Sequence, residues 1–215
     1  MKRYKGKFIT LEGNDGCGKS TQLKLLAEYL QSKGLDIALT REPGGTLPSC
    51  AIIRDLLQNP DYKNQITRMA ELFLFEANRS IHTTHLVLPA LEQSKVVLCD
   101  RYYDSTTAYQ GIAGKLGLDL VLMLNKLASH GLTPDLTFYI DAIPEETLGK
   151  IGTTEFGKQD RLEARPKEEH QRRVDCFRAL SLLEPGRIKI IKYIPNNPDE
   201  MQKQIRAYAD QLLFI

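Results

Sequence analysis

The stretch of sequence that decides the fold is residues 13–20, Gly13-Asn14-Asp15-Gly16-Cys17-Gly18-Lys19-Ser20. It fills every fixed position of G-x-x-x-x-G-K-[ST], and it stands between an apolar run at residues 7–11 and a helical pattern at residues 20–32. Glycines let the backbone turn tightly and expose amide N–H groups to phosphate oxygens, and the following helix directs its positive end at the same phosphates. The stretch therefore predicts a P-loop, the phosphate cradle of a nucleoside triphosphate.

Two side chains of the P-loop carry specific chemistry. Lys19 can reach the β- and γ-phosphates, and the Ser20 hydroxyl can ligate Mg²⁺. Cys17 is expected to contribute only its backbone, with a reactive thiolate as the alternative because helix N-termini lower the pKa of cysteine. The residues expected to bind the phosphates of ATP are Gly13, Asn14, Asp15, Gly16, Cys17, Gly18, Lys19, Ser20 and Thr21.

Apolar runs alternate with helical patterns along the rest of the chain. Strands are predicted at residues 7–11, 37–40, 96–99, 136–140 and 188–191. Strands separated by helices need crossover connections, so we expect an α/β fold with a mainly parallel sheet covered on both faces.

Three helices are predicted between and after these strands. The helix at residues 20–32 has an apolar face, a long helix at residues 67–92 bends near Pro89, and an amphipathic helix follows Pro198. The apolar face of the first helix is expected to comprise Leu23, Leu25, Leu26 and Leu30.

Composition excludes several classes of protein. Of the 215 residues, 42% are hydrophobic and the net charge is only +2, which gives no reason to expect nucleic acid or a membrane surface as a partner. No apolar run approaches the length of a membrane span, and the apolar stretch after the basic N-terminus breaks at Glu12, too early for a signal peptide. The four cysteines lie far apart without metal-ligand spacing, so we expect a reduced, cytoplasmic protein.

A second set of polar residues follows the strand at residues 96–99. Ligands bind beyond the carboxyl ends of strands in an open parallel sheet, and Asp100 and Arg101 come at that place. Asp100 can hold the Mg²⁺ shell, and Arg101 can bridge donor and acceptor phosphates and neutralise charge in the transition state. The alternative is an ion pair that only caps the strand.

Phe75 and Arg79 stand four residues apart on the long predicted helix, so they share one face. A ring and a guanidinium side by side suit a flat base, because one stacks and the other donates hydrogen bonds. The alternative for Phe75 is a position in the core.

Together these motifs resemble bacterial thymidylate kinases over nearly the whole chain. The most specific stretch is residues 100–111, D-R-Y-Y-D-S-T-T-A-Y-Q-G, followed by residues 40–46, T-R-E-P-G-G-T. Further matches are the P-loop, the helix at residues 75–79, and residues 134–141 and 160–163.

The resemblance implies a fold and an activity. The fold is a P-loop kinase with a five-stranded parallel sheet in the order 2-3-1-4-5, as a single domain over residues 1–215 with a mobile lid at about residues 150–166. The activity is direct in-line transfer of a phosphate from ATP, with Mg²⁺, to dTMP, giving dTDP for dTTP synthesis. A homodimer and a cis peptide between Glu42 and Pro43 are also implied.

The resemblance also assigns roles to residues. Phe75 would stack on thymine and Arg79 would hydrogen-bond it, while Tyr109 would crowd the sugar 2′ position and disfavour ribonucleotides. Metal ligands would be Ser20 and Asp100. The residues implied to bind dTMP are Asp15, Arg41, Glu42, Arg54, Phe75, Arg79, Arg101, Thr106, Tyr109 and Gln110.

The catalytic group implied is Lys19, Arg101, Asp15 and a basic residue of the lid. Gly16 stands where some relatives carry an arginine in the P-loop, so the lid is expected to supply it. Among the candidates, Arg161 is expected to close over the ATP phosphates because a planar, permanently charged fork fits them best. The other candidates are Lys150, Lys158 and Arg165.

Two other functions stay open at this point. Another small nucleotide or deoxynucleoside kinase on the same fold would take a different acceptor. A nucleoside acceptor would need a carboxylate base, for which Glu12 or Glu42 is available. A regulatory ATPase would hydrolyse ATP without an acceptor and would leave the arginines and aromatic residues of the acceptor side unexplained. His82 and His85 are expected to have surface or packing roles.

Overall fold

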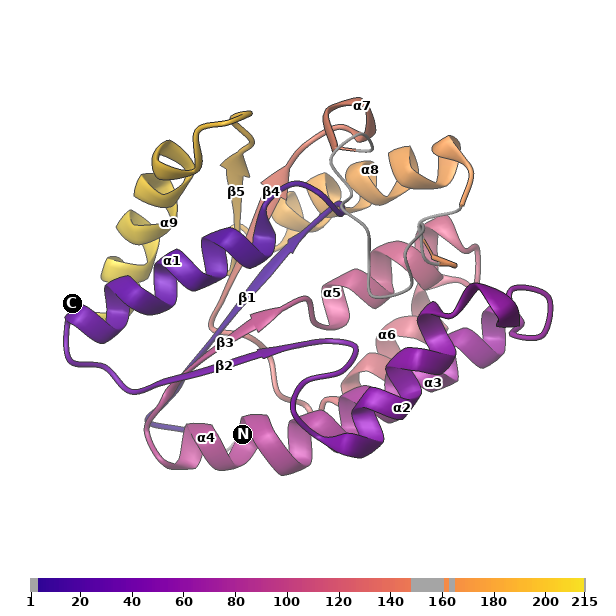
Figure 1. Ribbon diagram of the computed structural model, residues 1–215, viewed down its shortest axis with the longest axis horizontal. Helices are drawn as coiled ribbons and strands as arrows, with labels where there is room; N and C mark the ends of the chain where they lie inside the picture. Colours follow the sequence, from indigo (N-terminus) through magenta and orange to yellow (C-terminus); the bar gives the residue numbers. More distant parts are fainter. Residues whose placement is uncertain (1–3, 148–160, 163–164, 215) are drawn as a thin grey trace.

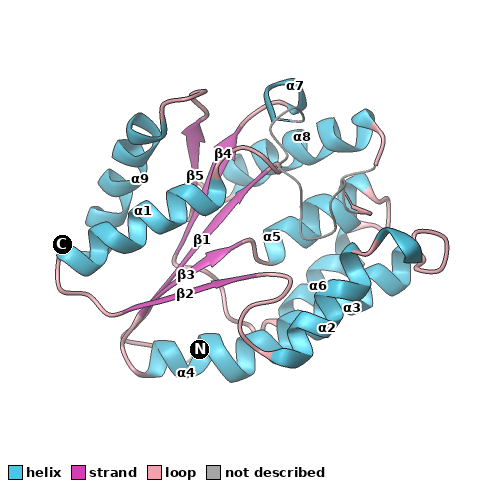
Figure 2. Ribbon diagram, viewed as in Figure 1, coloured by secondary structure: helices cyan, strands magenta, loops and turns pink. Residues whose placement is uncertain are grey.

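Parallel strands form the sheet on which the chain is built (Figures 1 and 2). The computed structural model describes residues 4–147, 161–162 and 165–214, and within these residues the sheet has five strands in the order β2-β3-β1-β4-β5. All four pairings are parallel. The predicted strands and their order are therefore confirmed. The strands are β1 (Lys7–Gly13), β2 (Ile37–Arg41), β3 (Val96–Asp100), β4 (Leu136–Asp141) and β5 (Ile188–Lys192).

Helices cover both faces of this sheet (Figure 1), as predicted. One face packs against α1 (Lys19–Ser32) and α9 (Pro198–Leu213), and the other packs against α4 (Leu88–Glu92) and α8 (Lys167–Leu183). The remaining helical segments are α2 (Pro48–Gln58), α3 (Arg68–His82), α5 (Tyr103–Thr106), α6 (Leu118–Ala128), α7 (Pro144–Thr147), the 3₁₀ turn η1 (Pro60–Tyr62), and the π-helical segments η2 (Thr83–Val87) and η3 (Thr107–Ala113). Among the residues described, none of the helices is both long and apolar enough to cross a membrane.

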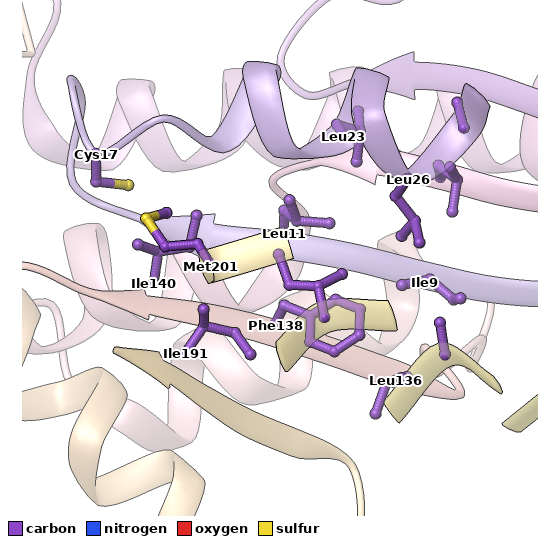
Figure 3. Close-up of a cluster of buried hydrophobic side chains, with 14 of the residues drawn as sticks. Ile9, Leu11, Cys17, Leu23, Leu26, Leu136, Phe138, Ile140, Ile191 and Met201 are labelled. Atoms are coloured by element: carbon purple, nitrogen blue, oxygen red, sulfur yellow. The ribbon is translucent and has the colours of Figure 1, made fainter. Parts of the chain in front are cut away.

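The larger core cluster lies between the sheet and the α1–α9 pair (Figure 3). Leu23, Leu26 and Leu30 of α1 are buried in it, against Ile9 and Leu11 of β1. Leu25 was expected on this face, but it is only half-buried and does not belong to the cluster. That prediction is wrong because successive residues of a helix turn by about 100°, which places Leu25 on the flank of the stripe.

The long helix predicted at residues 67–92 is continuous but changes its winding. It begins at Thr67, whose side chain accepts a hydrogen bond from the Ala70 N–H at 3.2 Å, and it passes from α3 through η2 to α4. Pro89 lacks an N–H, and in a regular helix its ring would clash with the carbonyl of His85. The wider turn of η2 comes just before Pro89 and relieves that clash, while the bend expected near Pro89 stays a prediction.

The register of the sheet brings three strand ends together. Leu11 of β1 and Arg41 of β2 both pair with Asp100 of β3. Three segments therefore leave the sheet side by side at the carboxyl ends of the strands: the P-loop, the segment after β2 and the segment after β3. Ligands of parallel sheets bind at this end.

Candidate active site

The P-loop lies between β1 and α1. Gly13 takes a φ of +141°, and a Cβ placed there would lie 2.8 Å from the carbonyl oxygen of Ile140. Gly18, immediately before α1, takes a φ of +91°. L side chains rarely adopt these conformations, so the turn itself requires the glycines.

Lys19 is folded back onto this loop. Its Nζ donates to the carbonyl oxygens of Gly13 and Asn14 at 3.1 and 2.9 Å, and to Asp15 Oδ1 at 3.2 Å. Burial alone would lower the pKa of Lys19, but the carboxylates of Asp15 and Asp100 help to raise it above its ordinary value. The side chain is a fixed positive charge at the floor of the P-loop.

Cys17 is fully buried in the loop and belongs to the core beside α1. Burial raises the pKa of its thiol despite the nearby Lys19 and Arg101. Its full burial and the raised pKa both argue against the alternative of a reactive thiolate.

Ser20 and Asp100 form a pair of oxygen ligands suited to Mg²⁺. The Ser20 hydroxyl donates to Asp100 Oδ2 at 2.7 Å. Asp100 Oδ1 is buried, and none of the residues described here gives it a hydrogen-bond partner. A buried carboxylate oxygen in that state has a place for a cation or for the water of its hydration shell.

Arg101 joins the P-loop to the segment after β3. Its Nη2 donates to Asp15 Oδ1 at 2.5 Å, its Nη1 donates to the Ser105 hydroxyl at 3.1 Å, and its guanidinium lies 5.2 Å from the centre of the Tyr109 ring. The backbone at Arg101 takes a φ of +68°, which is uncommon for a side chain of this size. The Arg101 N–H donates to the Leu11 carbonyl at 2.9 Å, so the sheet holds this conformation in place.

Glu12, the last polar residue before the P-loop, also bonds to the segment that follows β3. One carboxylate oxygen accepts from the Tyr102 N–H at 2.8 Å and the other accepts from the Ser105 hydroxyl at 2.6 Å. Burial, with help from the Asp104 carboxylate, raises the pKa of Glu12 to about 7. Both oxygens are bonded and the side chain is fully buried, so Glu12 is poorly placed as a base toward a substrate hydroxyl.

These elements line one cavity of about 390 Å³. Phe75 is only partly buried and faces this cavity, so the alternative of a core position does not apply. Every residue expected to bind dTMP and both expected metal ligands are among its lining residues, as are Gly16, Gly18, Lys19 and Thr21 of the P-loop. Their individual roles stay predictions.

A buried network fixes Glu42 and Arg79 at the wall of the cavity. Glu42 precedes a cis peptide to Pro43, as the resemblance implied, and its two oxygens accept from His82 Nδ1 at 2.8 Å and from Arg79 Nε at 3.0 Å. His82 is fully buried and its other ring nitrogen lies 2.8 Å from the Thr40 hydroxyl. The sequence alone predicts only a surface or packing role for His82, although its spacing of three residues from Arg79 already puts it on the same helix face.

The lid lies mostly outside the described residues, and Lys150 and Lys158 fall in the part that is not described. Arg161 is described and does not lie among the residues that line the cavity. Its Nη1 donates to Glu71 Oε2 at 2.6 Å and its Nε donates to the Leu57 carbonyl at 3.1 Å. In the structure Arg161 thus contacts α3 through Glu71, and its expected contact with the ATP phosphates stays a prediction.

Comparison with known proteins gives the family. A model of the thymidylate kinase family matches residues 11–205. The chain belongs to the thymidylate kinase family. It is 47% identical over 207 residues to a thymidylate kinase of Dehalococcoides mccartyi strain 195, covering 96% of this chain and 97% of the relative. It is also 44% identical over 183 residues to one of Exiguobacterium sp. strain AT1b, covering 85% of this chain and 84% of the relative.

A solved structure agrees with this family. The crystal structure of thymidylate kinase from Ehrlichia chaffeensis is similar with a TM-score of 0.76 and 33% identity, covering 95% of this chain and 98% of that one. The resemblance stated from the motifs is therefore confirmed, and the P-loop kinase fold with it. Phosphorylation of dTMP to dTDP, the activity that the resemblance implied, is the one for which this family is named.

The raised pKa of Glu12 predicts a pH dependence of stability. Because the folded pKa, about 7, lies above the ordinary 4.5, the folded chain keeps a proton that the unfolded chain releases in this window. The free energy of unfolding should therefore fall as pH rises from about 4.5 to 7. Between pH 5 and 8 the wild type should lose about 2 kcal/mol more than Glu12→Gln.

Urea unfolding at both pH values measures this difference. Glu28→Gln, at an exposed position of α1, serves as the control and should follow the wild type. Parallel pH profiles for the wild type and Glu12→Gln would show that Glu12 is ionised in the folded state over the whole range.

Proposed function

We propose that the chain transfers the γ-phosphate of ATP, bound with Mg²⁺, directly to the 5′-phosphate of dTMP and so produces dTDP. The observation that carries this proposal is that the P-loop and the acceptor residues line a single cavity, joined by the hydrogen bond between Asp15 and Arg101. Membership of the thymidylate kinase family supports the choice of acceptor.

The donor side is proposed to bind ATP through the P-loop N–H groups and Lys19. Ser20 and Asp100 would hold Mg²⁺, which when bound neutralises charge on the transferring phosphate. Asp100 Oδ1 supports this role, because it has no hydrogen-bond partner within the described part of the chain. Arg101 would contact both the donor and the acceptor phosphates, and its bonds to Asp15 and Ser105 support this role.

On the acceptor side, one group of residues is proposed to bind the phosphate of dTMP and another to bind its base. Arg41 and Arg54 would surround the monophosphate, and the Arg54 guanidinium is held by the Pro43 carbonyl at 2.7 Å. Phe75 would stack on the thymine ring. The polar edge of the base would meet residues Arg79, Thr106 and Gln110, and Tyr109 would exclude a 2′-hydroxyl.

The surroundings of both candidate bases argue against a nucleoside kinase. Glu12 is occupied by Tyr102 and Ser105, and Glu42 is occupied by Arg79 and His82. A monophosphate acceptor needs no base, because its attacking oxygen is already ionised at neutral pH. Alignment and charge neutralisation are then sufficient.

Arg161 is proposed to reach the ATP phosphates only when its ion pair with Glu71 opens. Arg161 pairs with the Glu71 carboxylate, and a guanidinium binds carboxylates and phosphates through the same planar fork, so the ATP phosphates are proposed as its alternative partner. On this proposal Arg161→Ala lowers kcat by about tenfold or more, which is 1.36 kcal/mol of transition-state stabilisation per factor of ten. Turnover within about threefold of the wild type would leave Arg161 with the Glu71 contact alone.

The chain is also proposed to be a cytoplasmic homodimer. Large apolar side chains are exposed on three neighbouring helices, α2, α3 and α6, and an apolar surface of this kind supports burial against a second copy. The residues are Ile52, Met69, Phe73, Leu118, Leu122, Met123 and Leu127. Light scattering at micromolar concentration should give twice the mass of the chain, and a monomeric mass would contradict the dimer.

Turnover of a panel of acceptors tests the function. ADP release with ATP and Mg²⁺ should be strong with dTMP, weaker with dUMP, and negligible with dCMP, dGMP, UMP and thymidine. Preferred turnover of thymidine or of another monophosphate would keep the kinase and overturn the acceptor. Hydrolysis that does not depend on an acceptor would favour the regulatory ATPase.

A further inference from the structure

A buried carboxylate, Glu71, lies behind the base end of the cavity, and its only role described so far is its ion pair with Arg161. Glu71 stands on α3, four residues before Phe75 and eight before Arg79, so the three share one helix face. Phe75 and Arg79 line the cavity, whereas Glu71 is 3% exposed and does not. Glu71 therefore acts on a ligand only through other side chains.

Both oxygens of Glu71 accept hydrogen bonds from residues near the base end. Oε1 accepts from Gln110 Nε2 at 2.9 Å. Oε2 accepts from Arg161 Nη1 at 2.6 Å and from Arg165 Nη2 at 2.8 Å. Two guanidinium groups on one oxygen make this a charge-assisted pair, and the other oxygen is left for the amide of Gln110.

This arrangement decides which end of the Gln110 amide faces the cavity. A glutamine amide has a donor end and an acceptor end of nearly the same shape, and turning it over changes only its hydrogen bonds. A carboxylate can only accept, so it holds Nε2 toward itself. The oxygen Oε1 is then what Gln110 offers to the cavity that it lines.

Thr106 completes the pattern with a donor. Its Oγ1 accepts from Arg79 Nη2 at 2.9 Å, so its own hydrogen is left to donate. The edge thus presents a donor at Thr106 and an acceptor at Gln110. Thymine carries the complement, an acceptor at O4 and a donor at N3–H, whereas cytosine carries a donor at N4 and an acceptor at N3.

We propose that Glu71 is a positioning residue that sets base specificity, because it fixes the Gln110 amide so that the cavity takes a pyrimidine with an N3–H donor and rejects cytosine. The inference rests on the proposed function, phosphorylation of dTMP. It goes beyond that function by placing the control of cytosine rejection on a residue that does not touch the substrate. Uracil has the same edge as thymine, so Glu71 does not affect the choice between dUMP and dTMP.

The test is the ratio of kcat/KM for dCMP to kcat/KM for dTMP, measured on one preparation of each variant. A ratio from one preparation is independent of the fraction of folded enzyme, so it does not respond to a purely structural defect. In Glu71→Gln the new amide can donate or accept, so Gln110 can turn over and offer Nε2 to N3 of cytosine. The ratio should rise at least tenfold above that of the wild type, while the ratio of dUMP to dTMP stays unchanged.

Glu169→Gln is the matched control. Glu169 on α8 pairs with Arg68 of α3 at 2.5 Å and contributes to the same cluster of arginines, but it does not line the cavity. Its substitution removes an equivalent carboxylate from an ion pair and should leave the dCMP to dTMP ratio at the wild-type value. In a Gln110→Leu background, Glu71→Gln should have no further effect on the ratio, because its action passes through Gln110.

Three results would overturn the proposal. The first is a dCMP to dTMP ratio for Glu71→Gln within threefold of the wild type. The second is an equal rise in Glu169→Gln. The third is a crystal structure of the wild type with dTMP in which N3 of thymine does not contact Gln110 Oε1. This third test holds even if Glu71→Gln does not fold. Failure of the proposed function is a separate result, in which the wild type does not turn over dTMP at all.

Discussion

The parallel pairing of β1 with β3 is the interaction on which the rest of the site depends. Leu11 stands opposite Asp100, and the Leu11 carbonyl accepts from the Arg101 N–H at 2.9 Å. One residue further on, Glu12 accepts from the Tyr102 N–H at 2.8 Å. Because of these bonds, the P-loop and the segment that begins at Asp100 leave the sheet at the same level. A shift of one residue in this register would reverse the face of every side chain in β3 and separate the two halves of the site.

Buried ion pairs then hold the walls of the cavity in one arrangement. Glu42 is fixed by Arg79 and His82, Glu71 by Arg161 and Arg165, and the Asp104 carboxylate by two bonds from Arg187 at 2.6 and 2.9 Å. Burying charges of this kind contributes little net stability, because desolvation offsets the attraction. Their effect is on position: each pair fixes a side chain that lines the cavity or lies directly behind one. A site that works by alignment and charge neutralisation gains most from rigid walls.

The sequence predicted the elements of the fold better than the connections between their side chains. The five strands and the P-loop followed from apolar runs and one motif, whereas the order of the strands came from the resemblance alone. Leu25 shows the limit of an apolar pattern, since a leucine beside the buried face of a helix fits the same pattern as a leucine within that face. Pro89 marked where the long helix changes its winding, but nothing in the pattern predicted a π-helical turn there.

The candidate site shows the same division. Residues with a motif, such as Lys19, Asp100 and Arg101, line the cavity as expected. Glu12, Glu71 and His82 were not identified as supporting residues, because their partners are distant in sequence and depend on the fold: Glu12 bonds across 90 residues to Tyr102 and Glu71 across 39 to Gln110. The burial of Cys17 and the pairing of Arg161 likewise depend on packing that no local pattern specifies.

The strand register makes the P-loop and the acceptor residues after β3 one unit, joined by the hydrogen bond between Asp15 and Arg101. A double-mutant cycle with Asp15→Asn, Arg101→Met and the double variant measures this most directly, as kcat/KM for dTMP at saturating ATP and Mg²⁺. Residues in one hydrogen-bonded unit should be coupled by about 1 kcal/mol or more, so the double variant should be clearly more active than the two single losses multiplied together. Losses that are additive to within about 0.3 kcal/mol would show that the two residues act independently and would contradict the claim.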